Sequence, residues 1–289
     1  MSGLIAVTGA TGLLGRLVVE QLLARTSAER VVAIARNPDK VPAVLEKSVQ
    51  TRIADHDDRA AVDAALAGVD VLLLISGNQF GKRMAQHENV IRAAQQAGVS
   101  RIVYTSAPHA DTSETAIVAE HKATERMIRE SGLPYTILRN NSYHENYVPF
   151  LEPARATGSI IGSVRDGRVA SADHVDYAEA AAVVLSSAGH ENVAYELTGD
   201  TSWTYPKLAA TVADVLGTPV TYQDLSPAEH AEVLTASGLD DPTVDFLVQL
   251  DADVAAGVSA EATDQLRHLI GRPTTPLLDG LRAAAARLR

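Results

Sequence analysis

The chain has 289 residues, 46% of them hydrophobic, which supports a sizeable core in one large domain or in a nucleotide-binding domain with a smaller appendage. It contains no cysteine, which excludes disulfides, thiolate catalysis and cysteine-ligated metal centres. A formal net charge of −11 disfavours nucleic acid as a partner, because phosphates bind basic surfaces. No apolar stretch has the roughly 18 to 20 residues of a membrane helix, and the N-terminus lacks a signal pattern, so we expect a cytoplasmic protein without a membrane partner.

The first predicted element is a strand that runs into a glycine-rich turn and a helix. Residues 4–7 are apolar, Gly9, Gly12 and Gly15 follow at a spacing of three, and apolar residues then recur at helical spacing. The first glycine permits a tight turn, the second lets phosphates approach the backbone, and the third lets helix and sheet pack closely. Free N–H groups and the helix dipole favour an anion there. We predict that a dinucleotide's pyrophosphate contacts Gly9, Thr11, Gly12, Leu13, Leu14 and Gly15.

Strands and helices alternate after this unit. Further strands are predicted at residues 31–35, 49–53, 69–75, 101–105 and 135–138, with helices at residues 58–67, 82–97 and 115–131. This alternation is typical of an α/β fold with a doubly wound parallel sheet of the Rossmann type. We therefore predict an NADP(H)-binding Rossmann domain over residues 1–140.

The alternation stops after residue 140. Short strands at residues 194–197 and 220–222 are mixed with helices at residues 175–186, 205–216 and 227–236. We interpret residues 141–289 as a smaller α+β C-terminal lobe that binds the substrate, with some segments returning to the sheet.

The residues that follow the second, third and fourth strands indicate the cofactor. Arg36 stands where an NAD-preferring site carries an acidic residue, and a guanidinium there can pair with the 2′-phosphate of NADP. Asp55 is either an acceptor for the adenine amino group or a turn residue. Ser76, Gly77 and Asn78 follow the fourth strand, where a glycine allows close approach to the nicotinamide ribose, although a polar turn would look the same.

Two residues near the predicted sheet edge are candidates for contact with the reacting groups. Ser106 ends the fifth strand, so its hydroxyl either faces the nicotinamide or bonds to backbone. His121 either positions or protonates the substrate, in the usual titration range of histidine, or forms an ordinary surface pair with Glu125 four residues on. No second histidine lies at ligand spacing from it, so we expect no metal site.

The densest polar cluster of the chain follows the sixth strand, at residues 139–147. Ligands bind beyond the carboxyl ends of parallel strands, so this segment is the best candidate for the floor of the site. Asn140, Asn141 and Tyr143 are its predicted cofactor contacts, and His121, Asn140 and Tyr143 are the predicted catalytic residues.

These features together resemble the NmrA-like, atypical branch of the short-chain dehydrogenases/reductases, above all the bacterial NADPH-dependent quinone oxidoreductases and triphenylmethane reductases. The resemblance spans nearly the whole chain and rests on IAVTGATGLLG, VVAIARNP, LLLISG, YTSAPHADTS, AEHKATE, YTILRNNSYHENY and IGRPTTPL. It implies NADPH as cofactor, held by residues 9–15, Arg36 and residues 76–78. It also implies that the segment from Asn140 to Tyr147 borders nicotinamide and substrate.

Most of that superfamily uses a Tyr-x-x-x-Lys pair as the acid, and no tyrosine of this chain has a lysine four residues on. Quinones and cationic dyes accept hydride with a proton from water, so the missing pair matters less for them. We therefore expect a flavin-independent, NADPH-dependent reductase of a quinone or similar conjugated electrophile.

Two alternatives stay open at this stage, together with the oligomeric state. The first is reduction of a ketone, an imine or a carbocationic dye, with His121, Tyr143 or His144 as the acid. The second is a non-catalytic NmrA-like sensor that binds NADP(H) and acts on a regulatory partner. A homodimer is compatible with the sequence but not required by it.

Overall fold

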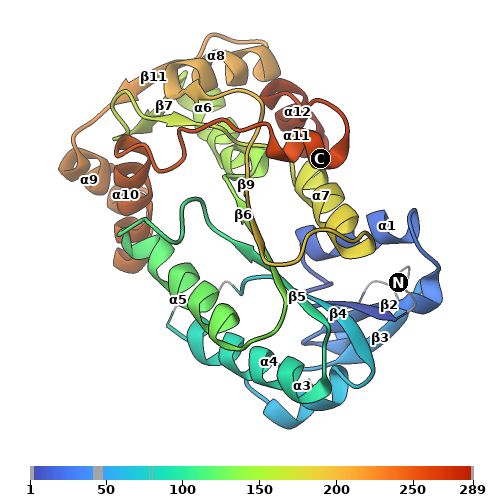
Figure 1. The fold of residues 1–289 in the computed structure, drawn as a ribbon. Helices are drawn as coiled ribbons and strands as arrows, with labels where there is room; N and C mark the ends of the chain where they lie inside the picture. Colours follow the sequence, from blue (N-terminus) through green and yellow to red (C-terminus); the bar gives the residue numbers. More distant parts are fainter. Residues whose placement is uncertain (1–2, 42–47, 78, 80, 288–289) are drawn as a thin grey trace. The chain divides into compact units, whose positions relative to one another are not determined.

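The computed structural model describes residues 3–41, 48–77, 79 and 81–287, and these form two compact units (Figure 1). Unit 1 comprises residues 1–140, 174–197 and 268–271, and unit 2 comprises residues 141–173, 198–267 and 272–289. The chain thus passes from one unit to the other several times. Among the described residues, no helix combines the length and the apolar character that a membrane span requires.

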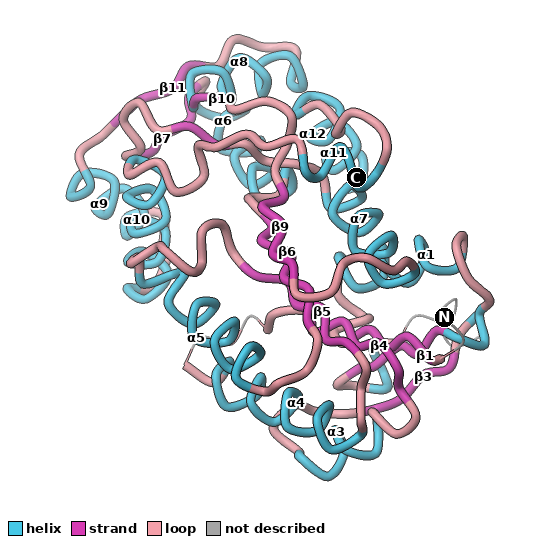
Figure 2. Tube along the Cα trace, viewed as in Figure 1, coloured by secondary structure: helices cyan, strands magenta, loops and turns pink. Residues whose placement is uncertain are grey.

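Unit 1 contains a seven-stranded sheet whose strands all pair in parallel, in the order β3-β2-β1-β4-β5-β6-β9. Figure 2 shows these strands in one continuous row. They are β1 (Leu4–Val7), β2 (Val31–Ala35), β3 (Gln50–Ile53), β4 (Val69–Leu74), β5 (Arg101–Ser106), β6 (Tyr135–Asn140) and β9 (Val193–Leu197). The order reverses between β1 and β4, which is where doubly wound sheets bind dinucleotides. The predicted α/β Rossmann fold is confirmed.

Helices cover both faces of this sheet (Figure 1). On one face α1 (Leu13–Leu23) packs against α7 (His174–Ser186), and on the other α4 (Arg83–Ala97) lies between α3 (Arg59–Ala65) and α5 (Ala116–Glu130). Short 3-10 helices, η1 (Ala28–Arg30) and η2 (Pro38–Lys40), flank β2. The central strands are buried on both faces, as parallel sheets require, and Leu72, Ile102 and Ile137 are fully buried members of the core.

The sheet takes one strand and one helix from beyond residue 140. β9 pairs with β6, and α7 packs on α1, so residues 174–197 belong to unit 1. The sequence predicts both elements and some return of the chain to the sheet, without indicating that these segments return. The assignment of cofactor binding to one unit and substrate binding to the other stays a prediction.

Unit 2 is built from helices and two small two-stranded sheets, with β10 (Trp203–Thr204) antiparallel to β8 (Arg168–Val169) and β11 (Thr221–Asp224) parallel to β7 (Ser159–Gly162). Its helices are η3 (His144–Phe150), α6 (Leu151–Thr157), α8 (Tyr205–Leu216), α9 (Pro227–Ala236), α10 (Asp241–Ala255) and α12 (Leu277–Arg287). The helix α11 (Gln265–Ile270) contains the passage between the units.

The core of unit 2 is aromatic at its centre. Tyr147 meets the Trp203 ring edge-on, with centroids 4.7 Å apart, and both rings are buried against Leu208. Edge-to-face pairs of this kind stabilise a core beyond the area they bury. Sequence periodicity predicts α8 and α9 with their observed bounds but misses α10, whose buried face is carried by few residues, such as Val244 and Val254.

Candidate functional site

The glycine turn between β1 and α1 has the form of a phosphate cradle. Gly9 has a φ of +60°, in the left-handed region, and its carbonyl accepts from the Gly12 N–H at 2.9 Å. Gly15 is buried, and a Cβ there would lie 2.3 Å from the Gly9 carbonyl oxygen. The helix N-cap is Gly12, and no side chain caps the helix, so the first-turn N–H groups are left to a ligand or to water. A dinucleotide's pyrophosphate fits this turn.

The predicted contacts of this turn differ in exposure. Gly9 and Gly12 are exposed, Thr11 and Leu13 are half-buried, and Leu14 and Gly15 are buried. Leu14 and Gly15 therefore support the turn from within, and the exposed backbone of Gly9 and Gly12 is accessible to a ligand; the predicted contacts with the pyrophosphate stay predictions.

Gly77, in the loop after β4, has neither a positive φ nor a close contact that would exclude a Cβ. Eleven glycines have a positive φ, and at the others a Cβ would lie within 3.3 Å of another atom. At Gly77, φ lies outside that region and the nearest atom to a Cβ would be Oε1 of Gln86, at 3.6 Å. Among the described residues, no atom comes closer than ordinary contact to this position, which leaves room for a ligand to approach the Gly77 Cα. Ser76, beside it, donates its N–H to Oγ1 of Thr105 at 2.9 Å, and Asn78 lies outside the described residues.

Arg36 and Asp55 follow β2 and β3 at the same edge of the sheet. Arg36 is exposed, and its side chain forms no hydrogen bond or ion pair with another described residue, so its guanidinium is available to an anion. Asp55 accepts the Asp57 N–H through Oδ1 at 3.0 Å, which is the turn role considered for it. Its predicted bond to adenine stays a prediction.

Ser106 belongs to a buried ionic network of unit 1. Its hydroxyl donates to Oε1 of Glu125 at 2.6 Å, and Arg139 binds both oxygens of that carboxylate, at 2.9 and 2.8 Å. Glu125 is fully buried, so it does not form the surface pair with His121 that was one alternative for this helix. Arg139 also pairs with Glu196 and Asp111, at 2.8 and 2.9 Å. The network joins β5, α5, β6 and β9, and it leaves the predicted contact of Ser106 with nicotinamide untested.

His121 is oriented by a buried tyrosine. Its Nδ1 lies 2.8 Å from the hydroxyl of Tyr104, which is fully buried on β5. Burial, with a further contribution from the Arg83 guanidinium, lowers the pKa of His121 to about 4. The imidazole is therefore neutral at pH 7, and the expectation of an ordinary titration range for it is wrong. His121 can offer a neutral N–H but not an imidazolium proton.

The polar segment after β6 divides its side chains between two environments. Asn140 ends β6 and is buried in unit 1. In unit 2, the side chain of Asn141 donates to the Ser259 carbonyl at 3.1 Å and accepts the Ser142 N–H at 2.7 Å, and Tyr143 is half-buried at the start of η3. The predicted roles of Asn140, Asn141 and Tyr143 toward cofactor and substrate stay predictions.

Comparison with known proteins identifies the family from which these features come. The sequence profile of the NAD(P)H-binding family matches residues 9–191, which is more than half of the chain. The chain belongs to this NAD(P)H-binding family. It is also 46% identical to quinone oxidoreductase 2 of Escherichia coli, over 96% of this chain and 97% of that protein.

Two crystal structures resemble this NAD(P)H-binding protein over nearly its whole length. The NADPH-dependent quinone oxidoreductase of Escherichia coli, complexed with NADPH, has a TM-score of 0.93 at 46% identity and covers 99% of both chains. The triphenylmethane reductase of Citrobacter sp., complexed with NADP(H), has a TM-score of 0.92 at 36% identity and covers 97% of this chain and 99% of that one. The resemblance stated from the sequence motifs is confirmed.

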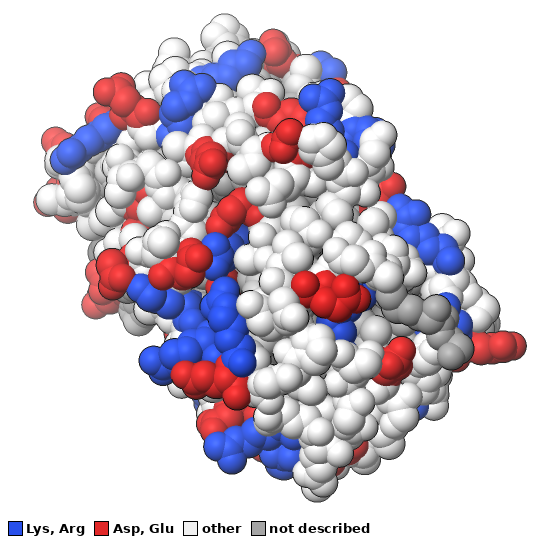
Figure 3. All heavy atoms as spheres, in the orientation of Figure 1, with Lys and Arg blue, Asp and Glu red and all other residues white. Residues whose placement is uncertain are grey.

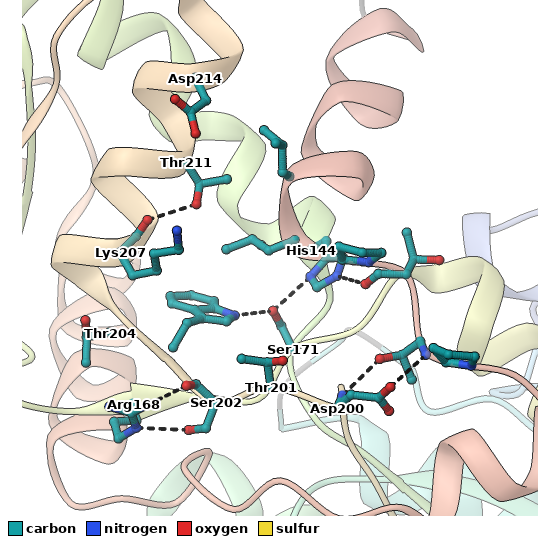
Figure 4. Close-up of a pocket in the computed structure, with 17 residues that line it drawn as sticks. His144, Arg168, Ser171, Asp200, Thr201, Ser202, Thr204, Lys207, Thr211 and Asp214 are labelled. Atoms are coloured by element: carbon teal, nitrogen blue, oxygen red, sulfur yellow. Dashed lines mark hydrogen bonds between the residues drawn. The ribbon is translucent and has the colours of Figure 1, made fainter.

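A cavity of about 520 Å³ lies within unit 2 (Figure 4), and the residues that line it include none of the predicted cofactor contacts. The Thr275 carbonyl, 2.9 Å from Nε2 of His144, can only accept, so the proton of the neutral ring lies on Nε2. Nδ1 then accepts from the Ser171 hydroxyl, 2.8 Å away, and Ser171 itself accepts from the Trp203 indole at 2.9 Å. Both ring nitrogens of His144 are thus used within unit 2, which argues against the proton-donor role considered for it.

Two functional candidates escaped the sequence reasoning. His87 and Arg83, on α4, contact the N–H and the carbonyl of Gly77, and both side chains are buried. Their spacing of four residues on a predicted helix was the available signal, because it places both on the face toward the preceding loop. Figure 3 shows basic side chains beside acidic ones on the left part of the face that it draws, and a broad area without charged side chains to the right of them.

Proposed function

We propose that this protein is an NADPH-dependent reductase that transfers a hydride, without flavin, to a quinone or a similar conjugated electrophile. The observation that carries the proposal is the similarity to a quinone oxidoreductase, because it extends over 96% of this chain at 46% identity. NADPH, when bound, supplies the hydride. The protein holds the acceptor in the position and orientation in which it can receive the hydride.

We assign the cofactor contacts to unit 1. The exposed backbone at Gly9 and Gly12 binds the pyrophosphate, and Arg36 pairs with the 2′-phosphate through charge-assisted hydrogen bonds. Ser76 and Gly77 receive the nicotinamide half. The preference for NADPH over NADH then follows from Arg36, since an exposed guanidinium stabilises the additional phosphate.

The acceptor is bound by Asn140, Asn141 and Tyr143 in this proposal, with unit 2 as the substrate lobe. His121 has no imidazolium proton to give to the acceptor at pH 7, because burial lowers the pKa of its ring to about 4. A quinone requires no enzymic acid when water supplies the proton after hydride transfer. A site without an acid at His121 therefore suits a quinone, which is electrophilic without protonation, better than it suits a simple ketone.

A cationic triphenylmethane dye is the second candidate acceptor. The similarity to the Citrobacter triphenylmethane reductase extends over 97% of the chain at 36% identity, which favours this dye class over imines and ketones. Such a dye is also a strong electrophile that accepts hydride at carbon without an acid. The cytoplasmic location and the homodimer considered from the sequence stay predictions.

Oxidation of NADPH by the purified protein tests the proposal. No flavin is added, the acceptors are a quinone series, a triphenylmethane dye, a ketone and an imine, and NADH is measured in parallel. We expect turnover of quinones with NADPH preferred. Turnover of the dye alone would favour the second candidate, and tight NADPH binding without turnover of any acceptor would favour the sensor.

A further inference from the structure

The backbone of Gly77 is held on both sides of its Cα by side chains from α4. Its N–H donates to Nε2 of His87 at 3.2 Å, and its carbonyl accepts from Nε of Arg83 at 2.7 Å. His87 is completely buried and Arg83 is 5% exposed. The two residues lie one helical turn apart and so share a face of α4. The two peptide groups that flank the Gly77 Cα are thereby both fixed although glycine is the residue with the most backbone freedom.

The hydrogen bonds around His87 define a single tautomer. Because Nε2 accepts from Gly77, it carries no proton, and Nδ1 donates to Oγ1 of Thr124 at 3.0 Å. The Thr124 hydroxyl in turn donates to the Glu120 carbonyl at 2.8 Å. Burial, with a smaller contribution from the Arg83 guanidinium, lowers the pKa of His87 to about 3. His87 is therefore a permanent acceptor at the Gly77 N–H under physiological conditions.

Arg83 is oriented from α5. Its Nη1 lies 3.3 Å from Oε2 of Glu120, and Oε1 of the same carboxylate accepts the Gly81 N–H at 2.9 Å. One carboxylate thus holds both the arginine and the far end of the loop. The loop after β4 is attached to two helices at three of its backbone groups, and the Cα face of Gly77 stays open.

We propose that His87 and Arg83 are positioning residues that orient the backbone on both sides of the Gly77 Cα, so that the space over this Cα receives the nicotinamide-ribose half of the dinucleotide. The inference rests on the proposed function, from which it takes the dinucleotide. Its physical reason is preorganisation: a glycine peptide that is already fixed loses no further freedom when the ligand binds. Without the two side chains, each binding event would have to order the loop.

Paired substitutions of His87 test the role of its Nε2 atom. The terminal amide of glutamine reaches the position of Nε2, whereas that of asparagine reaches only the position of Nδ1. We expect His87→Asn to weaken NADPH binding about tenfold, the usual effect of losing one hydrogen bond, and His87→Gln to stay within about threefold of the wild type. Val90→Ala is the matched control, because Val90 is buried on α4 and lies more than 4 Å from a Cβ built on Gly77, and it should leave NADPH affinity unchanged.

The second probe is 2′,5′-ADP, which carries the adenosine and the 2′-phosphate but no nicotinamide ribose. We expect its affinity to be equal in the wild type and in both His87 variants, since the Gly77 loop does not contact it. Arg83→Met, which removes the donor to the Gly77 carbonyl, should show the same selective loss of NADPH affinity. This variant keeps the test available if His87→Asn does not fold.

Equal NADPH affinity in the asparagine, glutamine and wild-type proteins would overturn the inference. So would a parallel loss of NADPH and 2′,5′-ADP affinity, since that would indicate general disorder, and so would a wild type that does not bind NADPH. Because binding is measured and not turnover, a wild type that binds NADPH but reduces no acceptor would overturn the proposed function alone.

Discussion

Replacing Gly77 by alanine separates ligand binding from folding. The new Cβ would lie 3.6 Å from its nearest neighbour, which is ordinary contact, and φ is outside the left-handed region. A compatible Gly→Ala change stabilises the folded state by about 0.4–1 kcal/mol through the entropy of the unfolded chain. A ligand that rests on the Gly77 Cα would, however, meet a methyl group, and overpacking of this kind costs about 1–3 kcal/mol.

The expected result is therefore a protein at least as stable as the wild type that binds NADPH about 5- to 150-fold more weakly. Gly15→Ala is the contrasting variant, because its Cβ would lie 2.3 Å from the Gly9 carbonyl oxygen in a buried turn. It should lower the free energy of unfolding by about 1–3 kcal/mol or more. Urea unfolding measures the stability, and NADPH fluorescence titration measures the affinity. Unchanged NADPH affinity in a folded Gly77→Ala protein would refute the reasoning.

Three further predictions concern charge. Arg36→Ala should weaken NADPH binding about 10- to 150-fold, from a loss of about 1.5–3 kcal/mol, and hardly change NADH binding; an equal loss for both in parallel titrations would exclude the 2′-phosphate role. His121→Ala should leave kcat for a quinone nearly unchanged, because the ring, with a pKa of about 4, has no imidazolium proton to give at pH 7, and a collapse of kcat with the fold intact would restore His121 as an acid. Burial alone would raise the pKa of Glu125, but hydrogen bonds from Arg139 and Ser106 hold this pKa below its usual value. Glu125 therefore contributes fully to stability above its unfolded pKa of about 4.3, and this contribution is lost as the pH falls through the folded pKa. Arg139→Met should cost about 3–5 kcal/mol at pH 7 and reduce or reverse that acid loss, and urea unfolding from pH 7 to pH 3 would contradict this if the variant kept the wild-type pH slope.

Most of the cofactor half of the site follows from local patterns. The turn at Gly9 needs a left-handed residue, the helix after it needs apolar residues at a spacing of three and four, and both requirements are visible in adjacent residues. The exposed Arg36 was likewise found from its distance to the glycine turn alone. These features are readable because each depends on residues within one or two turns of the chain.

The environments of the buried ionisable side chains around the candidate site could not be predicted from local sequence patterns. Glu125 looks like a surface residue of an amphipathic helix, yet it is fully buried because Arg139, fourteen residues on, neutralises it. A histidine ordinarily titrates close to neutral pH, but burial beside Tyr104 and Arg83 lowers the pKa of His121. No periodicity encodes a desolvation cost, since that cost depends on which elements come to lie over the side chain.

The sequence by itself determined the parallel sheet and the glycine turn, and it singled out Arg36 as the residue that we propose distinguishes NADP from NAD, because strand, turn and helix signals are local and occur in the order that a doubly wound fold requires. Only the tertiary structure decided that β9 joins the sheet, more than fifty residues after its partner β6, and that His87 and Arg83 hold the Gly77 peptide. Contacts between distant segments depend on packing, and packing is set by the whole unit and not by any window of its sequence.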